Sequence, residues 1–116
     1  MSSILRLPNN ANGGEHSPID PSKVLSGKPQ QKTHNLYNNC EENFFCGVWS
    51  SDSGKWTVNY GEDEFCYMIS GNAIITDAQG NEEQVSAGDA FVVPAGFNGT
   101  WETVGNACKF YAIYEA

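Results

Sequence analysis

The sequence predicts an all-β fold: a small sandwich or barrel preceded by an extended arm. Residues 36–116 carry short runs of β-branched and aromatic side chains, separated by turn residues at close, regular spacing, which is typical of such a fold. Residues 1–35 are polar, hold four of the five prolines and show no sustained periodicity, which predicts an arm. A chain of 116 residues, 40% hydrophobic, suits one domain with one core.

The predicted strands follow one another closely along the chain. Polar and apolar residues alternate over 55–60, whereas residues 65–69 form a wholly apolar run. Gly71 and Gly80 are expected at tight connections between strands, because glycine adopts the positive φ that such turns need. Pro94 ends a strand where no hydrogen-bond donor is required. The predicted strands are residues 44–49, 55–60, 65–69, 73–76, 82–86, 90–93, 98–104 and 108–114.

Charge and hydropathy exclude two classes of partner. The formal net charge is −8, and residues 36–116 carry two basic residues against twelve acidic ones. An acidic body repels phosphate backbones, so nucleic acid is not expected as a partner. No apolar run approaches the roughly 20 residues of a membrane span, and the first residues lack the apolar core of a signal peptide. The sequence therefore predicts a soluble, cytoplasmic protein without a membrane partner.

The four cysteines do not form a metal-binding or redox motif. No pair has the C-x-x-C spacing of a zinc ribbon or a thioredoxin-like site. In a cytoplasmic chain the thiols are expected to stay reduced. Cys66 and Cys108 lie inside apolar strands and are expected to pack in the core.

Two blocks of sequence carry glycine, proline and acidic residues at fixed spacings. Residues 56–71 keep the spacing E-(x)6-G from Glu64 to Gly71, and residues 88–103 keep G-(x)5-P-x-G from Gly88 through Pro94 to Gly96. These blocks resemble the two motifs of the cupin superfamily. Three short segments resemble the EutQ-like or ureidoglycine-aminohydrolase-like single-domain cupins. They are E-D-E-F-C-Y, G-D-A-F-V-V-P-A-G-F and, in the arm, P-S-K-V-L-S-G-x-P. The resemblance implies an RmlC-like cupin jelly-roll β-barrel of uncharacterised function, because this superfamily hosts many activities.

The metal site of the superfamily is not carried over. The resemblance implies three histidines and one glutamate as ligands, and these positions fall on Val58, Tyr60, Gly99 and Glu64. Both histidines of the chain, His16 and His34, lie in the arm. No metal or other cofactor is therefore expected. A hard-cation site made by residues 62–64 is the alternative, but neighbouring strand residues face opposite ways, and a solvated acidic turn explains them better.

The resemblance also places a candidate pocket inside the barrel. Tyr60, Glu64 and Lys109 are the candidate catalytic residues, because Glu64 holds an inward motif position and Lys109 on the last strand can pair with it. Trp101, Trp56, Phe97 and Cys66 are the candidate ligand-binding residues. Each also has a purely structural interpretation: the tryptophans as core anchors, Tyr60 as a filler of the vacant metal volume, and Lys109 as an outward-facing lysine.

Three functions follow from this pattern, and the sequence ranks them. The first is binding of a small polar metabolite in the barrel, with acid–base processing by Glu64 left open. The second is a non-catalytic ligand-sensing or structural dimer module. The third, a metal-dependent cupin enzyme, is disfavoured by the absent histidines. The long arm needs a surface to lie on, which predicts a symmetric homodimer whose arm packs on its own barrel or on its partner.

Overall fold

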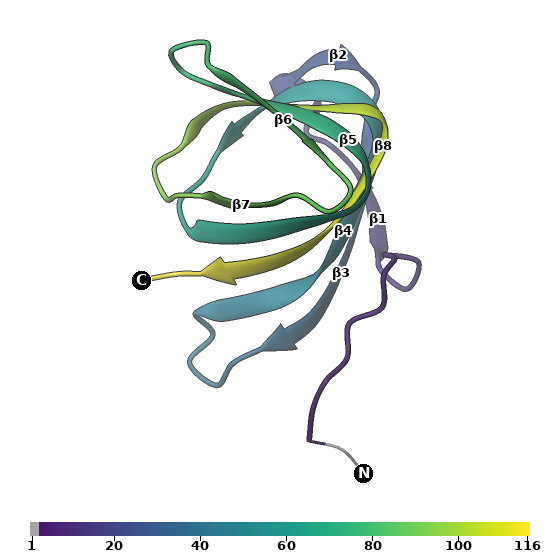
Figure 1. The fold of residues 1–116 in the computed structure, drawn as a ribbon, viewed down its shortest axis with the longest axis vertical. Helices are drawn as coiled ribbons and strands as arrows, with labels where there is room; N and C mark the ends of the chain where they lie inside the picture. Colours follow the sequence, from purple (N-terminus) through teal and green to yellow (C-terminus); the bar gives the residue numbers. More distant parts are fainter. Residues whose placement is uncertain (1–2) are drawn as a thin grey trace.

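Within residues 3–116, which are the residues that the computed structural model describes, eight antiparallel strands form one curled sheet (Figure 1). The strands are β1 (Glu15–Pro18), β2 (Val24–Gly27), β3 (Gln30–Asn38), β4 (Phe44–Asn59), β5 (Asp63–Asp77), β6 (Glu82–Ser86), β7 (Ala90–Val93) and β8 (Asn98–Tyr114), with a 3₁₀ turn, η1 (Pro21–Lys23), before β2. The order is β1-β3-β4-β8-β5-β6, with β2 paired to β4 and β7 paired to β5. This is the predicted all-β jelly roll.

Three long strands, β4, β5 and β8, bend through the whole roll (Figure 1). Bulges shift their register between Asp52 and Gly54 in β4 and on both sides of Gly71 in β5. Gly71 has a φ of +82°, and a Cβ there would lie 1.8 Å from the carbonyl oxygen of Asn106, so only glycine fits this bend. The two strands predicted over 65–76 are therefore one continuous strand, and so are the two predicted over 98–114.

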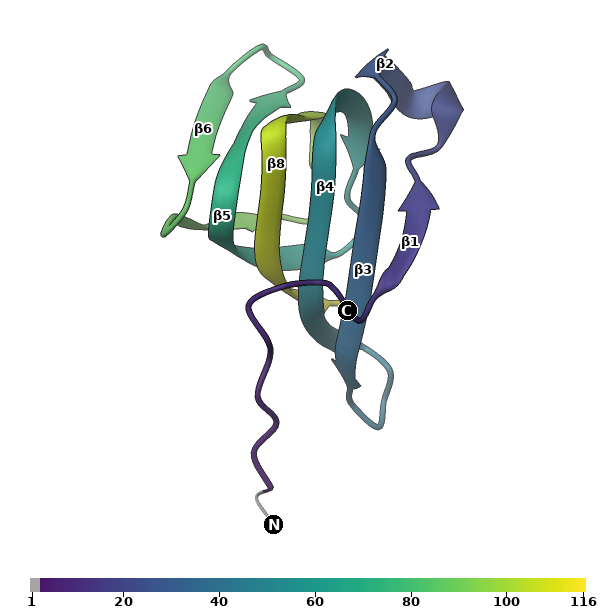
Figure 2. The ribbon, with the colours of Figure 1, turned by 90° about the vertical axis from the view of Figure 1, so that its right-hand side faces the viewer.

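The N-terminal segment takes part in the sheet. The boundary predicted at residue 35 falls inside β3, which pairs with β1 on one side and with β4 on the other. Before β1, the chain crosses the outer side of β8, β4 and β3 (Figure 2). Ala11 is buried there, and a Cβ on Gly14 would lie 2.6 Å from the carbonyl oxygen of Thr33. These pairings use backbone atoms, so a polar sequence without periodicity can make them.

The core fills one half of the roll, and the other half holds polar groups. The core cluster consists of Ile19, Trp56, Met68, Ala73, Ile75, Val85, Trp101 and Ala107. In the half with polar groups, Glu64 lies near the start of β5 and Lys109 lies towards the end of β8. Both side chains are buried. Among the described residues, no helix has the length and apolarity to cross a membrane.

Candidate functional site

A cavity of about 740 Å³ occupies the half of the roll that the core leaves open. The inner faces of β3 and β4 form one wall, and residues of β5 and β8 form its base. Three tryptophans, Trp49, Trp56 and Trp101, are among its lining residues, and Trp56 and Trp101 are almost fully buried. Polar side chains of β3, β4, β5 and β8 line it together with the aromatic ones, and a cavity of this size is typical of a small-molecule site.

A buried ion pair lies at the base of this cavity. The Lys109 ammonium donates a hydrogen bond of 2.8 Å to Oε2 of Glu64, and the two residues are 5% and 8% exposed. Strand alternation explains why both side chains point inward: Lys109 lies opposite Met68 across β5 and β8, and Glu64 is two inward positions from Met68. The Cys66 thiol, on the inward position between them, donates to the same Glu64 oxygen at 3.1 Å. Charge-assisted bonds of this kind are the strong ones.

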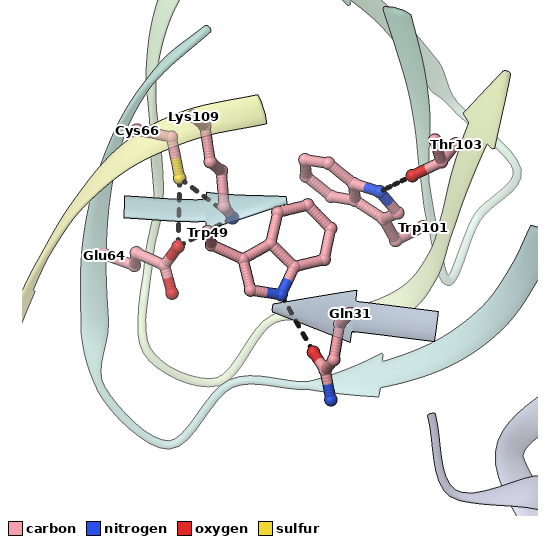
Figure 3. A network of polar contacts seen from close by, with 7 residues as sticks. All are labelled: Gln31, Trp49, Glu64, Cys66, Trp101, Thr103 and Lys109. Atoms are coloured by element: carbon pink, nitrogen blue, oxygen red, sulfur yellow. Dashed lines mark hydrogen bonds and ion pairs between the residues drawn. The ribbon is translucent and has the colours of Figure 1, made fainter. Parts of the chain in front are cut away.

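The Lys109 ammonium also lies over two indole rings (Figure 3). Its Nζ is 4.5 Å from the ring centroid of Trp101 and 4.9 Å from that of Trp49, within the range of cation–π attraction. The rings contact each other edge to face, with centroids 5.4 Å apart. Their N–H groups bond elsewhere, Trp49 to Oε1 of Gln31 and Trp101 to Oγ1 of Thr103. The ring faces therefore stay turned to the cation.

Burial keeps the neighbouring groups protonated. It raises the pKa of the Tyr60 phenol to about 12, although the Lys109 charge opposes this rise. Burial likewise raises the pKa of the Cys66 thiol to about 12. For Lys109, burial works to lower the pKa, but the negative groups facing it, Tyr60 when ionised and the Glu64 carboxylate, outweigh burial and raise its pKa. At neutral pH the Lys109 ammonium at the cavity base therefore has a protonated phenol and, behind Glu64, a protonated thiol as neighbours.

The structure brings together most of the site residues predicted from sequence. Tyr60, Glu64, Lys109, Trp101 and Trp56 all line the cavity. The remaining two predicted residues do not. Cys66 lies behind Glu64, and Phe97 packs edge to face against Tyr60, with ring centroids 6.0 Å apart.

Sequence reasoning missed part of the wall. Trp49 was expected only as part of an early core strand, yet it lies opposite Lys109 across β4 and β8. The inward residues of β3, Gln31, Thr33 and Asn35, also line the cavity, and Asn35 accepts a hydrogen bond of 2.8 Å from the Tyr111 hydroxyl. The signal for a strand was the alternation of these three residues with Lys32 and His34. It is weak because both faces of this strand are polar, so no apolar–polar pattern is visible.

Comparison with known proteins identifies the family. The family model described as EutQ-like cupin domain matches residues 40–111. The chain belongs to the EutQ-like cupin family. No curated protein matches this cupin.

Solved structures agree with this assignment. A protein of unknown function of the DUF861 family from Pseudomonas syringae pv. tomato is 30% identical, with a TM-score of 0.77, over 84% of this cupin and 42% of that chain. The EutQ protein of Clostridium difficile is 23% identical, with a TM-score of 0.67, over 76% of this cupin and 64% of that chain. An RmlC-like cupin from Shewanella frigidimarina is 11% identical, with a TM-score of 0.59, over 90% of this cupin and 86% of that chain. The last two likenesses concern the fold alone, and this cupin spans less than two thirds of the first two proteins.

The donor set of this cupin does not fit the metal site that the superfamily motifs imply. Gly99, at the third histidine position, has no room for any side chain, because a Cβ there would lie 1.9 Å from the Thr76 carbonyl oxygen. His34 alternates with the cavity-lining residues of β3, so it lies on the opposite face, and His16 is exposed on β1. In the part of the chain that the structure describes, no three His, Cys, Asp or Glu side chains are grouped as metal ligands. Glu64 is the one ligand position that keeps its residue type.

Proposed function

We propose that this cupin binds a small polar molecule in the cavity above the Glu64–Lys109 pair. The observation that carries the proposal is the buried ion pair itself, because charged groups are rarely buried unless they are paired or functional. The pair is neutral as a unit, and the indole rings of Trp49 and Trp101 lie against its ammonium. Such a site suits an uncharged or zwitterionic molecule that stacks against tryptophan and exchanges hydrogen bonds with Glu64 and Tyr60.

The protonation states favour binding over covalent catalysis. A thiol and a phenol with pKa values of about 12 are not nucleophiles at neutral pH, and a protonated Lys109 does not form a Schiff base. Of these groups, the Glu64 carboxylate is the one that can accept a proton from a ligand. We therefore place ligand binding first, and proton transfer by Glu64 is the chemistry that a turnover assay would reveal.

A ligand screen with a Tyr60→Phe variant tests this proposal. Within residues 3–116 the Tyr60 hydroxyl forms no hydrogen bond, which leaves it available to a ligand. A panel of small carboxamides, amino acids and polyhydroxy compounds is expected to include a compound that raises the melting temperature and quenches tryptophan fluorescence. Tyr60→Phe should weaken its binding about 2- to 13-fold, the range of one hydrogen bond of about 0.5–1.5 kcal/mol.

The control variant is Tyr114→Phe, which removes the same hydroxyl from an exposed tyrosine outside the cavity. It should bind the compound as the wild type does. Mass spectrometry of each stabilising compound then separates the two functions, since an enzyme consumes its ligand and a sensor leaves it intact. A panel that changes neither signal, or equal binding by both variants, contradicts the proposed site.

We further propose that two copies of this cupin pair through the outer face of the sheet. Phe65, Tyr67 and Val92 are 47%, 40% and 61% exposed on adjacent strands, and Tyr67 stacks on Phe110. Over 65–70, 90–93 and 110–114, the outward positions carry no charged side chain. Since each chain carries a net charge of −8, two copies can approach closely only through an uncharged surface. A second copy is therefore the occupant that we assign to this face.

Light scattering on purified protein tests the pairing. The wild type is expected to be a dimer at micromolar concentration, and Phe65→Asp should shift it to monomer by placing a charge in the interface. The control is Val104→Asp, which changes an equally exposed apolar residue on the part of β8 beyond the bend. Val104→Asp should stay dimeric. A monomeric wild type, or a dimeric Phe65→Asp, argues against this interface.

The free cysteines and the acidic charge of the chain support the predicted location and partners. All four cysteines are free, which is the state expected in the reducing cytoplasm. The acidic charge of the chain disfavours nucleic acid as a partner. We therefore propose a cytoplasmic protein whose partners are a small molecule and a second copy of itself.

A further inference from the structure

The position of Lys109 bears on a question that the missing histidines raise. Glu64 keeps the residue type of a metal ligand, and Oε2 of Glu64 is bonded at 2.8 Å to the Lys109 ammonium. The same ammonium is 3.5 Å from the Cys66 sulfur and faces the rings of Trp49 and Trp101. A single positive charge, the Lys109 ammonium, therefore binds Glu64, which is the one metal-ligand position whose residue type this cupin retains.

We propose that the Lys109 ammonium is a covalently tethered cation that replaces the metal ion of the cupin barrel. It supplies a fixed positive charge next to Glu64, and the two indole faces complete its environment. The inference goes beyond ligand binding, because it concerns which cation stabilises the folded barrel. It does not depend on whether the protein chemically converts its ligand.

Electrostatics makes the ammonium and a metal mutually exclusive. A divalent ion that approached Glu64 would meet a positive charge already hydrogen-bonded to that carboxylate, in a buried setting where charge repulsion is strong. Gly99 cannot offer a nitrogen ligand, as a side chain there would collide with the Thr76 backbone. The site therefore has one cation position, and the protein chain itself fills it.

The packing around the ammonium suits an organic cation. Indole faces attract ammonium groups through the ring quadrupole, whereas transition metals prefer imidazole, thiolate or carboxylate donors. The Cys66 thiol donates a hydrogen bond of 3.1 Å to Oε2 of Glu64, the same oxygen that Lys109 binds. Removing the lysine stem should leave a hole that an alkylammonium ion of matching length can enter.

The variant Lys109→Ala tests this inference by chemical rescue. The atoms that this change removes correspond to propylammonium, so propylammonium chloride should raise the melting temperature of Lys109→Ala by roughly 4–8 °C at about ten times its Kd. It should leave the wild type unchanged. 1-Propanol, which fills the hole without a charge, and sodium chloride at equal ionic strength are the controls.

Rescue by propanol equal to that by propylammonium, or no rescue by either, overturns the tethered-cation role. The metal half of the inference needs only the wild type and so does not depend on the variant folding. Wild-type protein purified without chelators and then incubated with Mn²⁺, Fe²⁺, Ni²⁺ or Zn²⁺ should hold far less than one metal per chain by elemental analysis. One tightly held transition metal per wild-type chain overturns the proposal, even where the ligand screen succeeds.

Discussion

The variant Lys109→Met is expected to lose about 3–5 kcal/mol of unfolding free energy, the usual consequence of removing one partner of a buried ion pair. Methionine keeps most of the side-chain volume, so the loss comes from the Glu64 carboxylate, which stays buried without its cation. Urea denaturation followed by tryptophan fluorescence measures the change. Glu64→Gln should also destabilise the protein, since it leaves the Lys109 ammonium buried with a neutral partner.

The matched control is Lys55→Met on β4, where the lysine is half-buried and forms no ion pair with any residue in 3–116. This change should alter the unfolding free energy by less than about 1 kcal/mol. The double variant Glu64→Gln/Lys109→Met should lose less than the two single losses together, because neither charge is then left alone. Equal losses for Lys109→Met and Lys55→Met, or strict additivity in the double variant, would show that the pair contributes no coupling.

Raising the pH from 8 to 11 is expected to lower the unfolding free energy by about 3–4 kcal/mol through Cys66 and Tyr60, since one pKa unit corresponds to about 1.4 kcal/mol. Burial raises the pKa of Cys66 from 9.0 to about 12 and that of Tyr60 from 10.0 to about 12. Between these values the unfolded chain has released protons that the folded chain keeps, so unfolding becomes easier as the pH rises. The raised pKa of Lys109 acts in the same direction.

Urea titrations of the wild type, Cys66→Ala and Tyr60→Phe at pH 8 and pH 11 measure this dependence. Each variant should lose less stability between the two pH values than the wild type, because one proton difference has been removed. The measurement at pH 8 is the internal control, because the Cys66 thiol and the Tyr60 phenol are mostly protonated there in both the folded and the unfolded chain. A wild type equally stable at both pH values would mean that the thiol and the phenol are not buried as described.

The resemblance of residues 56–71 to the first cupin motif implied the inward position of Glu64. The spacing from Glu64 to Gly71 matched the first cupin motif, and the structure buries Glu64 as that position requires. The sequence also offered Lys109 as its partner, and the 2.8 Å ion pair confirms the pairing. It left an outward lysine as an alternative, because a single lysine between Cys108 and Phe110 does not say which face of the strand is inside.

The sequence did not predict that the long strands continue through bends. Gly71 was expected at a connection, and its positive φ agrees with that expectation, but the chain continues in the same direction through a bulge. A glycine with positive φ serves a turn and a bulge equally well, and only the partner strand distinguishes them. Here the partner is β8, whose own backbone at Asn106 lies against Gly71.

The sequence by itself determined the fold class, the family motifs, the loss of the histidine ligands and the inward carboxylate. The tertiary structure alone decided that Trp49 faces Lys109, that β3 supplies a wall of the cavity and that the arm crosses the sheet. The reason is physical. Local patterns encode which residues share a face, whereas the register between strands far apart in the chain encodes which faces meet. The two indole rings over one ammonium depend on β4 and β8 being paired, and no local pattern in either strand specifies that pairing.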